Sequence, residues 1–249
     1  MTFSRLALAA CLAVVFVVAL VVSAPARLLS LVVPGNTVSL QGLSGTVWEG
    51  SASRSMVKLP AGHFHLGRLD WSLDPLSLLL FRPRLTVQSE WGPQTASGEV
   101  SLRGMRSVDV KDFEANFAAS LAKQFAPLAV DGSISVQVSD LAVRDGLPAG
   151  GQGRVVWQDA AWLSPQGPVL LGSYAMDFQQ DDEQPVLGRV ITLAGPMRAE
   201  GEASLDQRRY NINVLITSDE VIDGPIQHAL SLMAAPEGDG YRLALEGDI

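Results

Sequence analysis

A short stretch at residues 43–52, LSGTVWEGSA, places a tryptophan among glycines and other small residues, so it could belong either to a chemical site or to the framework of the fold. A similar stretch, GRVVWQDAA, follows at residues 153–161. Neither contains the G-x-S-x-G of a nucleophile elbow, a Walker lysine, or a G-x-G-x-x-G that leads into a helix. Glycine within a strand is typical of a bulge or a close backbone approach, and tryptophan gives a sheet a large apolar anchor. The stretch therefore predicts a structural part of a sheet rather than a catalytic or phosphate-binding site.

In the chain that follows this stretch, the dominant period of the hydrophobic residues is two. Apolar and polar residues alternate at residues 69–73, 134–138, 174–178, 210–216 and 241–245. Glycine and proline separate these segments at short intervals. This pattern is typical of antiparallel strands with one buried and one exposed face, so we predict a mainly β fold with an elongated, twisted antiparallel sheet.

The two tryptophan stretches are part of a longer internal similarity. Further short matches follow in the same order and at similar spacing: 66–67 with 171–172, 98–102 with 201–205, and 131–132 with 239–240. Ordered matches of this kind indicate tandem repeats. We therefore predict a first β-repeat unit at residues 37–147 and a second at 148–249, with Trp48 and Trp157 partly buried in equivalent strands. Whether the units share one sheet or form two packed sheets stays open.

Helical signals are few and short. Residues 74–79 carry an aspartate cap followed by a first-turn proline. Residues 113–125 have an apolar residue at every fourth position, and residues 224–235 have Pro225 near their start and are followed by Pro236. We expect a short helix at each.

The N-terminus carries an uninterrupted apolar run from Leu6 to Val22. A helix over this run is roughly 26 Å long, near the lower limit for crossing a bilayer core. A cleaved signal peptide is the alternative, but the run is longer than such peptides use, and Pro25 would follow the cut. We predict a transmembrane anchor at 6–24, with residues 1–5 cytoplasmic as Arg5 favours, and a linker at 25–36.

The formal net charge of −8 argues against a nucleic-acid partner. The single cysteine, Cys11, excludes an intrachain disulfide. We expect no nucleic acid, no cofactor and no metal.

Three clusters have residue types found in functional sites, and we interpret each as structural. Ser55 and Lys58 have the S-x-x-K spacing of a serine hydrolase, but the segment is extended and no partner motif occurs. His63 and His65 have no evident third zinc ligand, with His228 remote in sequence. The acidic run at 181–183 lacks the alternating spacing of a calcium loop. We therefore predict no catalytic, cofactor-binding or metal-binding residues.

Two longer segments resemble the type II secretion system protein N family. They are LQGLSGTVWEGSA at residues 40–52 and LGRLDWSLDPLSLL at residues 66–79. The resemblance implies a single-pass protein of the Gram-negative inner membrane with its bulk in the periplasm. It supplies no catalytic motif to transfer.

We accordingly expect a non-enzymatic accessory component of type II secretion. Its partners would be other type II secretion proteins and, through the N-terminal helix, inner-membrane lipid. The sheet would make protein–protein contacts, with strand addition at an exposed edge as one route. A lipid-handling periplasmic β-groove protein is the alternative, and a Ser/Lys hydrolase is a third hypothesis.

Overall fold

A computed structural model describes residue 12 and residues 15–32, 38–59, 62–104, 106–124, 129–164, 167–181, 184–219 and 224–248. The described residues form mainly strands, as the alternating pattern predicts. Helical segments are short and lie at the N-terminus, between strands and near the C-terminus.

All strands belong to one fourteen-stranded sheet. Its order follows the chain except at the end, where β14 lies between β12 and β13, and every pairing is antiparallel. The question left open by the sequence is therefore answered: the sheet is continuous. The strands are β1 (Val38–Gly45), β2 (Glu49–Leu59), β3 (Gly62–Leu73), β4 (Arg84–Trp91), β5 (Gln94–Leu102), β6 (Ser107–Ala118), β7 (Val130–Arg144), β8 (Leu147–Ser164), β9 (Gly167–Gln180), β10 (Val186–Ala194), β11 (Met197–Asp206), β12 (Arg209–Ser218), β13 (Ala235–Glu237) and β14 (Gly240–Asp248).

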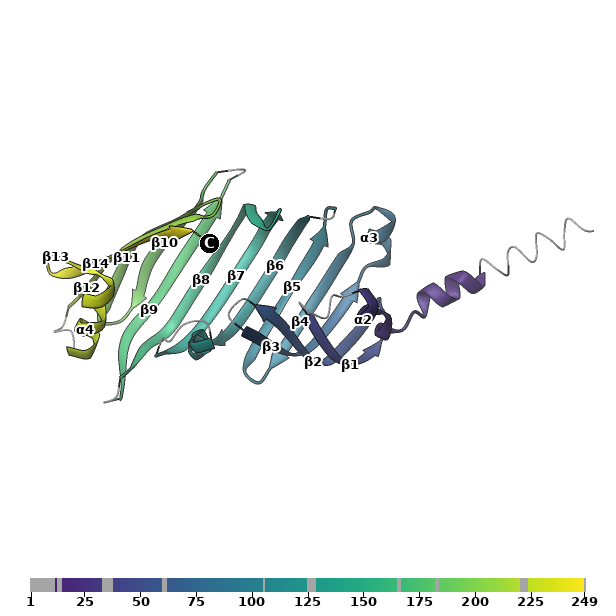
Figure 1. The fold of residues 1–249 in the computed structure, drawn as a ribbon, viewed down its shortest axis with the longest axis horizontal. Coiled ribbons are helices and arrows are strands. Elements are labelled where there is room, and N and C mark those ends of the chain that lie inside the picture. Colours follow the sequence, from purple (N-terminus) through teal and green to yellow (C-terminus); the bar gives the residue numbers. More distant parts are fainter. Residues whose placement is uncertain are drawn as a thin grey trace, which may run out of the picture.

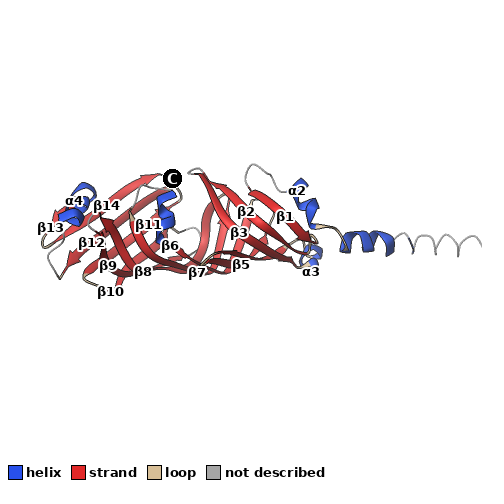
Figure 2. Cartoon of the chain, turned by 90° about the horizontal axis from the view of Figure 1, so that it is seen from below, coloured by secondary structure: helices blue, strands red, loops and turns tan. Residues whose placement is uncertain are grey.

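The sheet is elongated because successive strands are added side by side along the long axis of the molecule (Figure 1). Figure 2 shows that it also curves along its length, with the ends at β1–β2 and β12–β14 raised relative to the middle strands. A right-handed strand twist that accumulates over many strands produces this kind of curvature.

Two of the three predicted short helices are present. Asp74 caps α3 (Pro75–Leu79) by accepting a hydrogen bond from the Leu76 amide at 2.9 Å. The helix expected at 224–235 is α4 (Gly224–Met233). Further helical segments are η1 (Ala26–Leu28), α2 (Leu29–Val32) and η2 (Ala119–Gln124), and residues 15–22 are helical as well.

The helix predicted over residues 113–125 is wrong for its first half. Phe113 and Phe117 lie in β6, and only η2 is helical. Residues four apart share a face of a strand as well as a face of a helix, so this spacing does not distinguish the two. The long β6–β7 pairing settles the choice in favour of a strand.

The predicted anchor lies partly outside the described residues, which omit 6–11, 13 and 14. Residue 12 and residues 15–22 are helical. Within the part of the chain that is described, no helix is both long enough and apolar enough to span a membrane.

The two faces of the sheet differ in polarity. Cross-strand neighbours project to the same face, so the registers define rows of side chains that run across the sheet. One row is polar from β1 to β12: Ser44, Ser51, Asp70, Gln88, Ser97, Glu114, Gln137, Arg154, Asp177, Arg189, Glu202 and Asn213. On the other face the adjacent row is apolar or small apart from one serine: Leu43, Ala52, Leu69, Ser89, Ala96, Ala115, Val136, Val155, Met176, Val190, Gly201, Val214 and Leu243.

The core of this single-layer sheet is thin. Most of the buried apolar residues are alanines, such as Ala52 and Ala160, each with none of its surface exposed. The larger apolar side chains of the apolar row, including Val155 and Met176, remain partly exposed. A second layer of secondary structure normally buries such a face, and here short helices cover only parts of it.

The prediction for the two tryptophans is partly wrong. Both are partly buried, but Trp48 lies in the turn between β1 and β2, whereas Trp157 lies within β8. Gly45, with a φ of 83°, begins the turn that breaks the first strand. The second stretch stays extended through a bulge at Asp159, whose φ is 50°.

The proposed boundary between the two repeat units, at residues 147–148, falls at the start of β8 in an unbroken sheet, so the two-unit division stays a prediction.

Candidate interaction surfaces

The stretch at residues 43–52 joins the N-terminal helical segment to the sheet. The Trp48 indole N–H donates to the Val21 carbonyl at 2.8 Å, and the Val47 amide donates to the Ala24 carbonyl at 2.9 Å. Pro25 forms an isolated antiparallel bridge with Thr46. We call these contacts the joint. They fix the chain that leaves the N-terminal helix against the first turn of the sheet.

A small apolar cluster packs next to the joint. Ala26 and Ala52 are almost completely buried, and Trp71 is 6% exposed. The Trp71 indole N–H donates to the Val47 carbonyl at 3.2 Å. Partly buried residues pack around these three: Leu29, Leu40, Leu43, Leu69 and Leu85. The cluster thus holds η1, α2 and the first four strands together.

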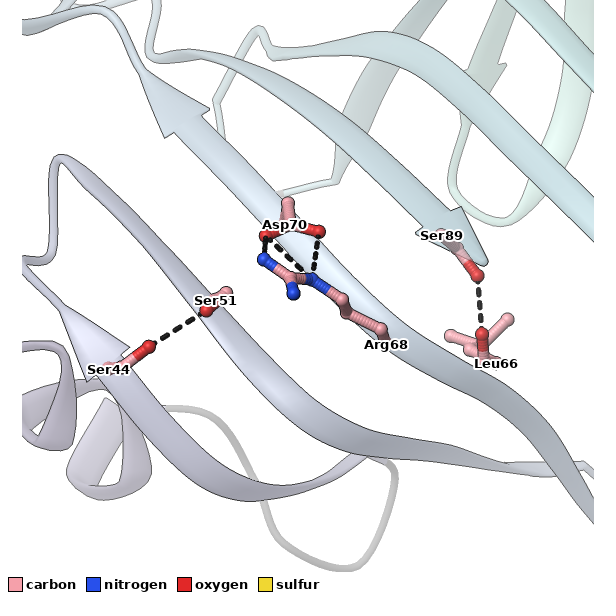
Figure 3. Close-up of polar contacts among 6 residues, drawn as sticks. All are labelled: Ser44, Ser51, Leu66, Arg68, Asp70 and Ser89. Carbon is pink, nitrogen blue, oxygen red and sulfur yellow. Dashed lines mark hydrogen bonds and ion pairs between the residues drawn. The ribbon is translucent and has the colours of Figure 1, made fainter. Parts of the chain in front are cut away.

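Polar contacts continue across the same strands (Figure 3). The Ser44 and Ser51 hydroxyls lie 2.8 Å apart, across the β1–β2 pair. Arg68 and Asp70, two residues apart in β3, form an ion pair with Nε–Oδ2 at 2.9 Å. The hydrogen bond from Arg68 lowers the pKa of the Asp70 carboxyl. Both groups are exposed, so this pair contributes little to stability.

The two lateral edges of the sheet differ in charge. Among the described residues, no strand pairs with the outer edge of β1 or with β14 beyond Arg242. The open part of β14 carries Glu246 and Asp248. By contrast β1, VSLQGLSG, contains neither a charge nor a proline. Charges and proline are the usual protection of an edge strand, so β1 is the less protected edge.

A polar hollow of about 1150 Å³ lies over β7 to β12 on the polar face. Its charged groups include Arg154 and Asp177, which form a bidentate pair with Nη2–Oδ2 at 2.8 Å. The hydrogen bond from Arg154 lowers the pKa of Asp177. The positive and negative charges alternate across the strands, so this hollow has no single-sign character that would select a charged ligand.

An apolar cavity of about 320 Å³ lies at the C-terminal end, between α4 and the apolar face. Its lining residues are Trp157, Trp162, Leu171, Tyr174, Val190, Met197, Ala199, Ile216, Ile226 and Leu230. Burial raises the pKa of Tyr174 to about 12.

The Ser/Lys pair does not form a hydrolase arrangement. Ser55 and Lys58 both lie in β2, so they are not on adjacent turns of a helix. Ser55 is completely buried, and its hydroxyl has no hydrogen-bond partner among the described residues, whereas Lys58 is exposed. A buried hydroxyl separated from its base cannot act as the nucleophile of this motif.

The histidine and acidic clusters are not assembled into a site by the described residues. His63 and His65 lie in β3, and His65 packs edge-on against Trp91 with ring centroids 4.7 Å apart. His228 lies in α4. Asp181 is exposed after β9, and residues 182 and 183 lie outside the described residues. In the described part of the chain, no three His, Cys, Asp or Glu residues gather in a way that could hold a metal ion.

Comparison with known proteins identifies the family. Residues 36–244 match the model of the type II secretion system (T2SS) protein N family. The chain is 24% identical over 216 residues to the type II secretion system protein N of Vibrio cholerae serotype O1 (strain ATCC 39315 / El Tor Inaba N16961), covering 82% of this chain and 81% of that protein. It is 23% identical over 256 residues to the type II secretion system protein N of Aeromonas hydrophila, covering 98% of this chain and 99% of that protein. No solved structure matches significantly.

The chain therefore belongs to the type II secretion system protein N family. It is a component of a protein secretion system, and this membership implies interaction with other proteins of that system. The sequence pattern indicated the family, but it did not indicate the joint or the apolar cavity. Both are made by residues far apart in sequence, such as Val21 with Trp48 and Trp157 with Leu230.

Proposed function

We propose that this protein is a non-enzymatic accessory component of type II secretion, anchored in the inner membrane with its sheet in the periplasm. The family membership supports the pathway. The apolar run from Leu6 to Val22 and the preceding Arg5 support a single-pass anchor with a cytoplasmic N-terminus. The joint supports a fixed attachment between that anchor and the sheet.

The contact surface is the outer edge of β1. An unprotected edge offers unpaired backbone N–H and C=O groups, which a strand from a partner can extend by β-augmentation. The segment Val38–Gln41 pairs regularly with β2, so its outer side is a regular edge. Gly42, with a φ of 65°, interrupts that regularity, so the added strand binds along the first half of β1.

Recruitment of a partner by this edge would require no catalytic residue. Backbone hydrogen bonds supply the affinity, and the side chains of β1 supply the specificity. The observation that carries the proposal is the charge-free edge of β1 in a chain of this family. Inner-membrane lipid is the second partner, through the anchor.

The test is deletion and complementation in a strain that secretes through this system. Export of a type II substrate into the medium is measured with the wild-type gene, with Gln41→Lys, and with Gln137→Lys as the matched control. Gln41 and Gln137 are both exposed strand residues, but Gln137 lies in the interior strand β7. A lysine on an edge strand opposes strand addition, so Gln41→Lys alone should leave substrate in the periplasm. Unimpaired export after deletion of the gene would refute the proposal.

The alternative function is that of a lipid-handling periplasmic β-groove protein. The continuous apolar row on one face of a curved sheet favours it. Mass spectrometry of the purified full chain tests it, because a groove that handles lipid should retain lipid after purification. Protein free of lipid would count against this alternative.

A further inference from the structure

The apolar cavity lies where α4 crosses the sheet. Ile226 and Leu230 of α4 form one wall, and Trp157, Tyr174, Val190 and Ala199 of β8 to β11 lie in the opposite wall. Ile226 is 6% exposed, so the helix is seated against the sheet rather than lifted away from it. Figure 2 places α4 on the side toward which the sheet curves.

The polar atoms of two lining aromatic residues are already used within the protein. The Tyr174 hydroxyl lies 2.9 Å from the Leu171 carbonyl oxygen and 3.1 Å from the Met197 carbonyl oxygen, so its single proton is shared between these two acceptors. The Trp157 indole N–H donates to the Asp131 carbonyl at 3.0 Å. The two donor protons are therefore already occupied, and the walls present mainly hydrocarbon and aromatic surface.

The cavity has the size of a ligand site. Its volume of about 320 Å³ lies at the lower end of the range of ligand pockets, and it is partly open to solvent rather than enclosed. An apolar molecule that enters it exchanges contact with water for contact with apolar walls, which is favourable.

We propose that this cavity binds one long alkyl chain, either of a fatty acid or of a phospholipid. A peptide segment fits less well, because its backbone would leave amides unpaired against these walls. The cavity lies at the end of the sheet opposite β1 and the predicted anchor, so the alkyl chain would have to reach this end of the protein (Figure 1). The inference does not depend on the secretion role, and it locates the apolar site that the alternative function would need.

The test uses the full-length protein in cells fed a fatty acid that carries a diazirine on its alkyl chain. After irradiation the protein is purified, and the labelled peptides are identified by mass spectrometry. Adducts should concentrate on peptides from β8 to β12 and from α4. The mass of the adduct, before and after phospholipase treatment, distinguishes a free fatty acid from a phospholipid.

Two alanine-to-phenylalanine variants provide the comparison. Ala199→Phe places a ring in the cavity, whereas Ala244→Phe adds the same ring at an exposed position of β14, on the polar face. Ala199→Phe should reduce labelling of the lining peptides by about tenfold, because the ring occupies the volume that the chain needs. Ala244→Phe should label as the wild type does.

The proposal fails if wild-type adducts are absent or are spread evenly over the apolar face. It also fails if the two variants label equally. Should Ala199→Phe not fold, the wild-type adduct map decides the question by itself. A secretion defect measured in the same strains is scored separately, because loss of export without loss of labelling concerns the secretion role alone.

Discussion

Replacing Gly50 with alanine tests how the joint is built. Gly50 lies in β2, opposite Gly45 and Trp71. A Cβ added there would lie 2.6 Å from the Ser44 carbonyl oxygen, 2.6 Å from Cζ2 of Trp71 and 2.8 Å from the Thr46 carbonyl oxygen. Two of these three atoms belong to the backbone, so they cannot move aside without opening the turn.

The expected magnitude follows from two opposing effects. Overpacking a well-packed site costs about 1–3 kcal/mol. Restricting the unfolded chain by a glycine-to-alanine change offsets about 0.4–1 kcal/mol of that cost. A net loss of about 1–2 kcal/mol should lower the melting temperature of a chain of this size by about 2–8 °C.

The assay is thermal unfolding of the full chain, followed by tryptophan fluorescence. Gly188→Ala is the matched control, because it lies in β10 and its added Cβ meets only the flexible Met176 side chain at 3.3 Å and Ala203 Cβ at 3.6 Å. The control should leave the melting temperature unchanged or raise it slightly. Equal melting temperatures for Gly50→Ala and Gly188→Ala would refute the close packing of the joint.

Two further predictions concern the joint and the cavity. Trp48→Phe removes the hydrogen bond to the Val21 carbonyl, which is worth about 0.5–1.5 kcal/mol, so trypsin should cleave faster after the exposed Arg27. The control Trp91→Phe, at the exposed end of β4, should not change the cleavage rate. Equal cleavage rates for the two variants would contradict the role of Trp48. Tyr174 has its pKa raised to about 12, above the ordinary value of about 10. The unfolded state therefore loses this proton first as the pH rises, and stability should fall between pH 10 and 12. Tyr174→Phe should flatten that slope in denaturant unfolding measured against pH, and an unchanged slope would exclude Tyr174 as its source.

The period of two in the sequence was sufficient to predict the mainly β fold. It succeeds here because one face of the sheet is apolar and the other polar, so each strand repeats the same alternation. Tyr174, Met176 and Phe178, for example, all have neighbours on the apolar face in β8 and β10. The predicted family is confirmed by the comparison with known proteins.

Prediction from the local sequence was wrong where one residue pattern is compatible with two kinds of secondary structure. The fourfold spacing of Phe113 and Phe117 fits a helix face and a strand face equally, and pairing with β7 decides it. The tryptophan stretches look alike, yet Trp48 lies in a turn and Trp157 in a bulged strand. A glycine's positive φ at Gly45 makes that difference, and the sequence does not specify φ.

The joint and the cavity could not be predicted because their contacts are long-range. Val21 contacts Trp48 across the predicted linker, and Leu230 of α4 lines the same cavity as Trp157 of β8. Periodicity identifies which residues share a face, but it does not say which segment covers that face. Only the register and the position of the helices supply this information.

Site-directed photo-crosslinking from β1 in living cells tests whether the β1 edge binds a partner strand. A photoreactive amino acid replaces Ser39 in β1 or, as the control, Ser139 in the interior strand β7. Strand addition at the β1 edge predicts that the Ser39 variant forms covalent adducts containing another type II secretion protein, while the Ser139 variant does not. The absence of such adducts from Ser39, or equal adducts from both positions, would contradict it.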